Sequence, residues 1–247
     1  MSVTSLTELW HEIVSAQADP PQALILGSGA AALLAVAPRP IWRLTRNAVT
    51  IAHEGGHALV ALCTGRRLSG IRLHADTSGV TVSYGKPRGP GMVFTALAGY
   101  IAPALLGLGG AALLGTGHIT ALLWACVVLL ALMLLMIRNW YGVLSLAATG
   151  AAVFGVTWFA TSQVQAVFGY FAVWFLLFGG VRPVFELQWQ RSRGRAPQSD
   201  ADQLAKLTGV PGLAWVLLFA IVALGAALLG AHWLIPQWNT HLHLPHL

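Results

Sequence analysis

Apolar residues are gathered into long stretches along the chain, and polar residues are mostly confined to the segments between them. The stretches cover residues 22–36, 48–63, 92–114, 119–137, 140–160, 164–181 and 210–235. About 20 consecutive apolar residues in a helix are enough to cross a bilayer. The pattern therefore predicts an all-α polytopic membrane protein with about seven transmembrane helices. The stretch 48–63 is short and unusual, because it contains His53, Glu54 and His57.

The segment between the second and third stretches has a different periodicity. Its apolar residues recur at every second position: Ile71, Leu73, Val80, Val82 and Tyr84. The turn-forming residues 76–79 lie between the two halves of this pattern. An alternation of period two on both sides of a turn is typical of a β-hairpin. The alternative is an ordinary polar loop.

The polar flanking segments carry weaker signals. Within residues 1–20, apolar residues at helical spacing predict a short amphipathic helix lying on the membrane surface. Residues 186–209 form a polar linker, in which Ser199 can cap a short helix over 200–207 that Gly209 ends. The tail 236–247, with three histidines, is expected to be solvated. Together these segments and the spans make one membrane-embedded domain.

Composition agrees with a membrane protein and argues against a soluble one. The chain of 247 residues is 56% hydrophobic and only 9% charged, whereas soluble domains are about 25% charged. The formal net charge is +6, but the basic residues lie between the apolar stretches. Their arrangement indicates membrane topology, and nucleic acid is not expected as a partner. Cys63 and Cys126 fall in or beside spans and are read as packing residues.

The distribution of Lys and Arg predicts an orientation. Three of the 14 lie at positions 39–46, five at 66–88, one at 138 and five at 182–206. With seven spans, the last three groups share one face, and their 11 charges would be cytoplasmic. The expected protein is therefore a multi-pass protein of the cell membrane. Its N-terminus, hairpin and active-site side would be cytoplasmic, and its C-terminus would be outside.

The sequence HEGGH at positions 53–57 carries the candidate chemistry. His53 and His57 are four residues apart, so both imidazoles project from one face of a helix and can bind one Zn²⁺. Glu54 would lie beside the open coordination position, where it can take a proton from the attacking water and pass it to the leaving amine. This is the pattern of zinc-dependent peptidases. The alternative is a pair of packing histidines beside a buried acid, but ionisable groups inside a span are costly and usually functional.

A catalytic zinc site commonly has three protein ligands, so a third is expected. Among the other acids, Glu8, Glu12 and Asp19 precede the first span, and Asp76 fits the hairpin turn. Asp200, Asp202 and Glu186 remain, all on the predicted face at which the HEGGH helix ends. The residues alone do not choose among these three. A carboxylate at position 200 would also fit the start of a helix, where it meets the positive end of the helix dipole.

A zinc-binding HEGGH inside a span, followed by a hairpin, resembles the site-2 protease family of intramembrane metallopeptidases. The stretch AGYIAP, positions 98–103, is similar to a family stretch, although Tyr100 and Pro103 replace its proline and asparagine. The stretch SDADQL, beginning at Ser199, resembles a divergent bacterial branch. The resemblance implies zinc as cofactor, His53 and His57 as ligands, Glu54 as catalytic residue and Asp200 as third ligand.

The function expected from the motif and the resemblance is regulated intramembrane proteolysis. A zinc metalloprotease in the bilayer would hydrolyse peptide bonds of membrane-anchored protein substrates. The open edge of the hairpin could pair with an unwound substrate strand. Two alternatives stay open: a membrane transporter that uses the histidines to bind a metal, and a non-catalytic membrane scaffold.

Overall fold

The structure is a computed structural model that describes residues 6–18, 20–196 and 198–235. The expected polar tail, 236–247, lies outside the described residues. In chain order the described elements are α1 (Leu6–Val14), α2 (Gln22–Val36), α3 (Arg39–Cys63), β1 (Arg67–Leu73), β2 (Gly79–Tyr84), α4 (Pro90–Gly115), α5 (Ile119–Leu134), α6 (Trp140–Phe159), α7 (Ser162–Ser192), α8 (Asp200–Thr208) and α9 (Gly212–Leu234). The protein is thus mostly helical with one small hairpin, as the sequence predicts.

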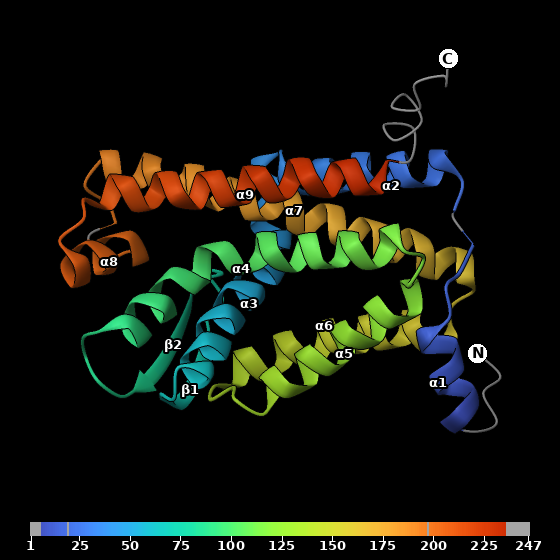
Figure 1. Cartoon of the computed structure of the whole chain (residues 1–247), viewed down its shortest axis with the longest axis horizontal. Coiled ribbons are helices and arrows are strands. Elements are labelled where there is room, and N and C mark those ends of the chain that lie inside the picture. Colours follow the sequence, from blue (N-terminus) through green and yellow to red (C-terminus); the bar gives the residue numbers. More distant parts are fainter. Residues whose placement is uncertain (1–5, 19, 197, 236–247) are drawn as a thin grey trace, which may run out of the picture.

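The core of the bundle lies where α4, α7 and α9 pack together (Figure 1). Leu177 of α7 and Phe219 of α9 are completely buried there. Small residues let the helices approach closely: a Cβ added at Gly180 of α7 would lie 3.0 Å from the backbone nitrogen of Ala104 in α4. Small residues at helix contacts are characteristic of membrane bundles, in which dispersion between closely packed backbones replaces the hydrophobic effect.

The described helices include fewer candidate membrane spans than the predicted seven. Among the described residues, four helices are long and apolar enough to cross a membrane: α4, α6, α7 and α9. A fifth span is possible if α2 and α3 count as one, because they join at a bend of 103°. Helix α5 is apolar but has only 16 residues. The count of seven is therefore not confirmed.

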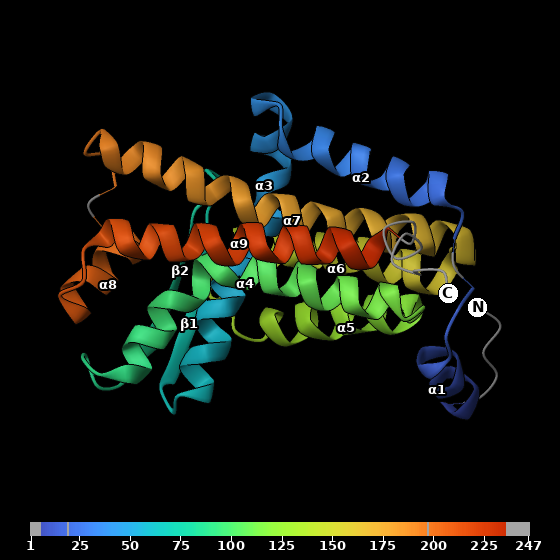
Figure 2. The same cartoon turned by 45° about the horizontal axis from the view of Figure 1, so that its top comes forward.

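The bend between α2 and α3 is held by a side chain of α7. Arg182 donates hydrogen bonds to the carbonyl oxygens of Val36 and Ala37, the latter at 2.8 Å. Its guanidinium also lies 5.0 Å from the centre of the Trp42 ring in α3, within the range of a cation–π contact. Carbonyls at the end of α2, which lack helical partners, are satisfied in this way. Helix α3 consequently turns away from α2 and crosses the bundle (Figure 2).

The bend also changes where the first group of arginines lies. Arg46 of α3 is 4.0 Å from Glu186 of α7, and Glu186 pairs with Arg182 at 2.8 Å. Arg46 therefore shares a carboxylate with Arg182, which the sequence assigned to the opposite face of the membrane. The division of 11 charges against three treated α2 and α3 as separate spans, which the structure does not confirm, so the orientation stays a prediction.

The N-terminal helix and the hairpin lie at opposite ends of the bundle (Figure 1). Gln17, just after α1, accepts hydrogen bonds from the backbone N–H groups of Ile119 and Thr120 at the start of α5. The hairpin instead pairs with the chain beyond the other end of α5, at Ile137. The side of the membrane that each end faces stays a prediction. The expected amphipathic helix near the N-terminus does form, as α1.

The predicted β-hairpin is confirmed: β1 and β2 pair antiparallel, with Ile71 opposite Thr81. The far edge of β1 is also occupied. The backbone of Ile71 exchanges hydrogen bonds with Met136 and Arg138, in the connection between α5 and α6. Next to it, the Asn139 side chain accepts from the Leu73 N–H at 3.1 Å and donates to the Leu73 carbonyl at 2.6 Å. Among the described residues, β2 has no strand partner other than β1.

The polar linker is shorter than predicted, because α7 continues to Ser192 and includes Glu186. The short helix in the linker is confirmed as α8. Its N-cap is Ser199, whose hydroxyl accepts from the Asp202 N–H, and its C-terminus is followed by Gly209 with φ of 77°. Both ends of α8 could be predicted because their sequence signals are local. A hydroxyl accepts from a free N–H at the start, and a glycine adopts the left-handed conformation at the end.

The arrangement of the two ends is testable by cysteine labelling. In a Cys63→Ala/Cys126→Ala background, we expect a Ser78→Cys variant in the hairpin turn and a Ser15→Cys variant beside α1 to label from opposite sides. An impermeant maleimide applied to intact cells, and then to inverted vesicles, measures the side. Labelling of both positions from the same side would contradict the arrangement of α1 and the hairpin described above.

Candidate metal centre

Helix α3 presents the two histidines of HEGGH side by side. The Nε2 atoms of His53 and His57 are 3.1 Å apart, and the rings meet edge to face. The Nδ1–H of His57 donates to the carbonyl oxygen of Thr95 in α4 at 2.7 Å. With that tautomer, the lone pair of His57 Nε2 points toward His53. Such a hydrogen bond from the remote nitrogen is typical of metal-binding histidines, since it sets the ring orientation.

Helix α8 brings a carboxylate to the same place. The Oδ2 atom of Asp200 lies 3.3 Å from the Nε2 atoms of both His53 and His57. This oxygen is buried and has no hydrogen-bond partner of acceptable geometry. An unpartnered buried carboxylate oxygen is costly, and one cation between the three side chains would satisfy it. The three ligand atoms lie within 4.8 Å of one another, so two imidazoles and a carboxylate fit a zinc ion.

One glycine of the motif, Gly56, and one glycine of α4, Gly99, allow this close arrangement. A Cβ added at Gly56 would lie 2.3 Å from the Cβ of Ala102 in α4. One added at Gly99 would lie 2.3 Å from Nε2 of His57 and 2.6 Å from Nε2 of His53. A side chain at Gly99 would therefore occupy the space between the ligands. The stretch AGYIAP borders the centre, and its Tyr100 ring packs edge-on against His53 at 4.9 Å.

Glu54 lies beneath the hairpin, and the residue is only 4% exposed. The Thr81 hydroxyl donates to its Oε2 at 2.6 Å. The Cα of Gly79 is so close that an added Cβ would lie 2.7 Å from Oε1 of Glu54. Strand β2 therefore covers the carboxylate predicted to act as general base. Its side chains Val80, Val82 and Tyr84 point away from α3 and are exposed.

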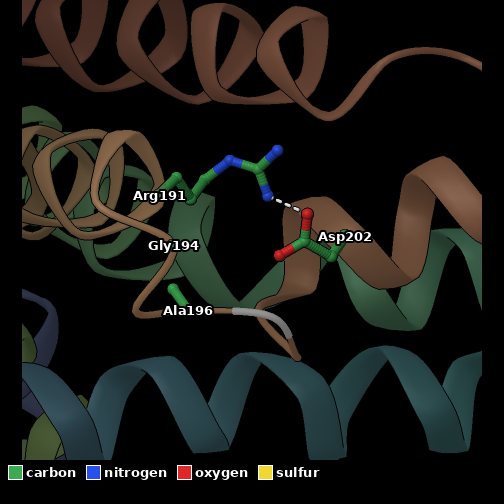
Figure 3. Close-up of a pocket in the computed structure, with 4 residues that line it drawn as sticks. All are labelled: Arg191, Gly194, Ala196 and Asp202. Atoms are coloured by element: carbon green, nitrogen blue, oxygen red, sulfur yellow. Dashed lines mark hydrogen bonds and ion pairs between the residues drawn. The ribbon is translucent and has the colours of Figure 1, made fainter.

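The two other candidate ligands are engaged elsewhere. Glu186 belongs to the ion pairs with Arg182 and Arg46 at the bend of α2 and α3. Asp202 pairs with Arg191, as Figure 3 shows, and accepts a hydrogen bond from the Ser199 hydroxyl at 2.7 Å. Burial alone would raise the pKa of Asp202, but Ser199 and Arg191 hold it below its ordinary value. Of the three acids, the structure brings only Asp200 to the histidines.

Helix α8, which carries Asp200, is anchored on several sides. Ala201 and Leu204 are completely buried in the core. Arg191, near the end of α7, bonds to Asp202 and lies 3.2 Å from the Ser199 hydroxyl. A small pocket of about 130 Å³ remains beside this ion pair (Figure 3). The N-terminus of α8, and with it Asp200, is thereby held against the end of α7.

The sequence missed the residues that contact these groups from other elements. Thr81 and Thr95 have no signal of their own, because a threonine in a strand or inside a helix is commonplace. Gly99 was noticed only as part of the stretch AGYIAP. The period-two pattern even drew attention to the wrong face of β2. The apolar residues of that strand are exposed, whereas Gly79 and Thr81 contact Glu54.

Comparison with known families agrees with this geometry. The family model described as Peptidase M50B-like matches residues 26–230. The chain belongs to this peptidase family. The match includes every residue of the candidate metal centre and supports the resemblance to site-2 proteases. The family and the apolar helices together make the protein a membrane peptidase. No curated protein and no solved structure matches the chain.

Proposed function

We propose that this membrane peptidase is an intramembrane zinc endopeptidase that cleaves membrane-anchored proteins in regulated intramembrane proteolysis. The observation that carries the proposal is the convergence of His53 Nε2, His57 Nε2 and Asp200 Oδ2 beside Glu54. These three side chains come from two elements, α3 and α8, that are far apart in sequence. A packing role for the histidines would not require a buried carboxylate oxygen that lacks a partner.

Each side chain then has a definite task. His53, His57 and Asp200 would hold the zinc, which when bound supplies a Lewis acid that polarises the peptide carbonyl and activates water. Thr95 orients the His57 ring through its carbonyl oxygen. Glu54 accepts the proton of the attacking water and donates it to the leaving amine. The hairpin above Glu54 and the helices around it keep bulk water from these groups.

Strand β2 is the proposed docking site for the substrate. A transmembrane helix must be unwound before a protease can attack one of its peptide bonds. The unwound segment then has backbone N–H and C=O groups that lack hydrogen-bond partners. Met136, Arg138 and Asn139 already occupy the far edge of β1. Within the described residues the outer edge of β2 has no strand partner, and the same strand contacts Glu54. A substrate that adds to β2 as an extra strand would lie next to the general base.

The hairpin end of the bundle is proposed to face the cytoplasm. Five basic residues lie at positions 66–88, and the arginines at 39–46 approach Arg182 and Glu186, toward the end of α7 that leads to α8. Arg138 adjoins the hairpin as well. Basic residues are enriched on the cytoplasmic side of membrane proteins. The membrane-anchored substrate would accordingly be cut near its cytoplasmic end.

Metal analysis tests the zinc site. We expect purified wild-type protein to contain about one zinc ion per chain, as a three-ligand catalytic site requires. The His53→Ala variant is expected to contain little. Elemental analysis after gel filtration gives the ratio, with His74→Ala, a histidine of the hairpin turn, as the matched control. Equal zinc in the wild type and His53→Ala would contradict the proposed centre.

A cleavage assay separates the peptidase from a metal transporter. Purified protein in liposomes is incubated with a pool of synthetic single-span peptides that carry short flanking segments, and mass spectrometry identifies the products. We expect cleavage that a zinc chelator stops and added zinc restores. Zinc uptake into the same liposomes without any cleavage would instead favour the transporter.

A further inference from the structure

Strand β2 makes a direct contact with the proposed general base. The Thr81 hydroxyl donates to Oε2 of Glu54 at 2.6 Å and also lies 3.1 Å from the backbone oxygen of Glu54. Two residues earlier, Gly79 lies against the other carboxylate oxygen, Oε1. Both oxygens of the carboxylate therefore meet β2, one through a hydrogen bond and the other through close packing.

This contact has a specific chemical consequence. Glu54 is 4% exposed, so its carboxylate has little access to water and depends on protein donors. A hydrogen bond from a fixed hydroxyl holds the carboxylate in one orientation. Position 79 must be glycine in this arrangement, because even a Cβ there would lie 2.5 Å from Cγ of Glu54. The side chain has three rotatable bonds, and without such support its orientation would not be unique.

We propose that Thr81 is a positioning residue that orients Glu54 for proton transfer, and that Gly79 leaves the space this orientation needs. The proposal rests on the proposed function, and it adds a coupling between the docking strand and the base. A substrate strand that pairs with the free edge of β2 acts on the same strand that holds Glu54. Substrate docking and orientation of the base are thereby linked through Thr81.

The kinetic test compares Thr81→Val with Thr81→Ser. Valine has nearly the shape of threonine but cannot donate, whereas serine retains the hydroxyl. We expect Thr81→Val to lower kcat about 10- to 100-fold, the usual effect of losing a group that orients a catalytic residue. KM and bound zinc should stay unchanged, and Thr81→Ser should recover most of the loss. The substrate is whichever single-span peptide the wild type cleaves.

The matched control is Thr50→Val. Thr50 of α3 donates to the carbonyl oxygen of Thr77 in the hairpin turn at 2.8 Å, so its hydroxyl also bonds the hairpin to α3, but through a backbone carbonyl and not through the Glu54 carboxylate. We expect its kcat to remain within about twofold of the wild type, well inside the effect expected of a lost orienting contact. If Thr50→Val and Thr81→Val lose kcat equally, general docking of the hairpin explains the effect and the proposal is overturned. A rise in KM with unchanged kcat would also overturn it, since Thr81 would then serve substrate binding.

A second measurement does not depend on activity. Melting temperatures of zinc-free wild type, Thr81→Val, Glu54→Ala and the double variant form a double-mutant cycle. We expect the double variant to lose less than the sum of the two single losses, because either change already breaks the contact. Strictly additive losses would overturn the contact itself. If the wild type cleaves no peptide, the proposed function fails, and with it the catalytic role of Thr81, whatever the cycle shows.

Discussion

Glu54→Gln is expected to abolish proteolysis while leaving about one zinc ion per chain. The amide keeps the size of the side chain but cannot accept the proton of the attacking water, and a lost general base lowers turnover by about 100-fold or more. The three ligand atoms belong to His53, His57 and Asp200, so the metal should remain. Turnover of a cleaved single-span peptide and elemental analysis of the same preparation provide the two readouts.

The informative control for Glu54→Gln is Glu186→Gln, because Glu186 is also a partly buried glutamate but pairs with Arg182 and Arg46 away from the centre. We expect this control to cleave and to bind zinc. A Glu54→Gln protein that loses its zinc would place Glu54 among the ligands. One that still cleaves at the wild-type rate would rule out the proposed peptidase mechanism.

Asp200→Ala is expected to lose both activity and most of the bound zinc. Its Oδ2 approaches both imidazoles and has no other partner, so its removal leaves only two ligands where a catalytic zinc commonly has three. Zinc competition with a chromophoric chelator measures the affinity of the purified variant. The expected loss is large because the group of possible metal ligands found among the described residues has Asp200 as its one carboxylate.

Asp202→Ala serves as the control for this prediction, since it removes a carboxylate two residues away on the same helix. Asp202 bonds to Arg191 and Ser199 and not to the histidines. We expect the variant to keep stoichiometric zinc. If Asp202→Ala were to lose zinc as completely as Asp200→Ala, loss of α8 docking would explain both results, and Asp200 would no longer stand out as a ligand.

Several features of the fold and site could be predicted because they depend on neighbouring residues. The hairpin follows from period-two alternation around a turn, and α8 from its capping serine and terminal glycine. The pairing of His53 with His57 follows from their spacing of four on a helix. In each case the interactions that decide the structure span only a few residues.

The number of membrane spans was predicted less well, and the contacts of Arg182 at the bend between α2 and α3 show why. Hydropathy identifies apolar stretches but does not say whether two neighbouring helices form two spans or one bent span. That decision depends on Arg182, which bonds to the chain at Val36 and Ala37, about 145 residues away in sequence. The positive-inside rule was applied to seven crossings, a number that the structure does not confirm. The predicted orientation of the N-terminus therefore stays a prediction.

The sequence by itself determined the class of protein, the hairpin, the histidine pair on α3 and a set of three acids from which a third ligand could come. Only the tertiary structure selected Asp200 from that set, because the packing of Ala201 and Leu204 and the pairing of Asp202 with Arg191 decide which carboxylate faces the histidines. Likewise, only the tertiary structure brought Thr81 and Gly79 onto Glu54. Local patterns encode periodicity and caps, whereas contacts between distant elements depend on how whole helices and strands pack.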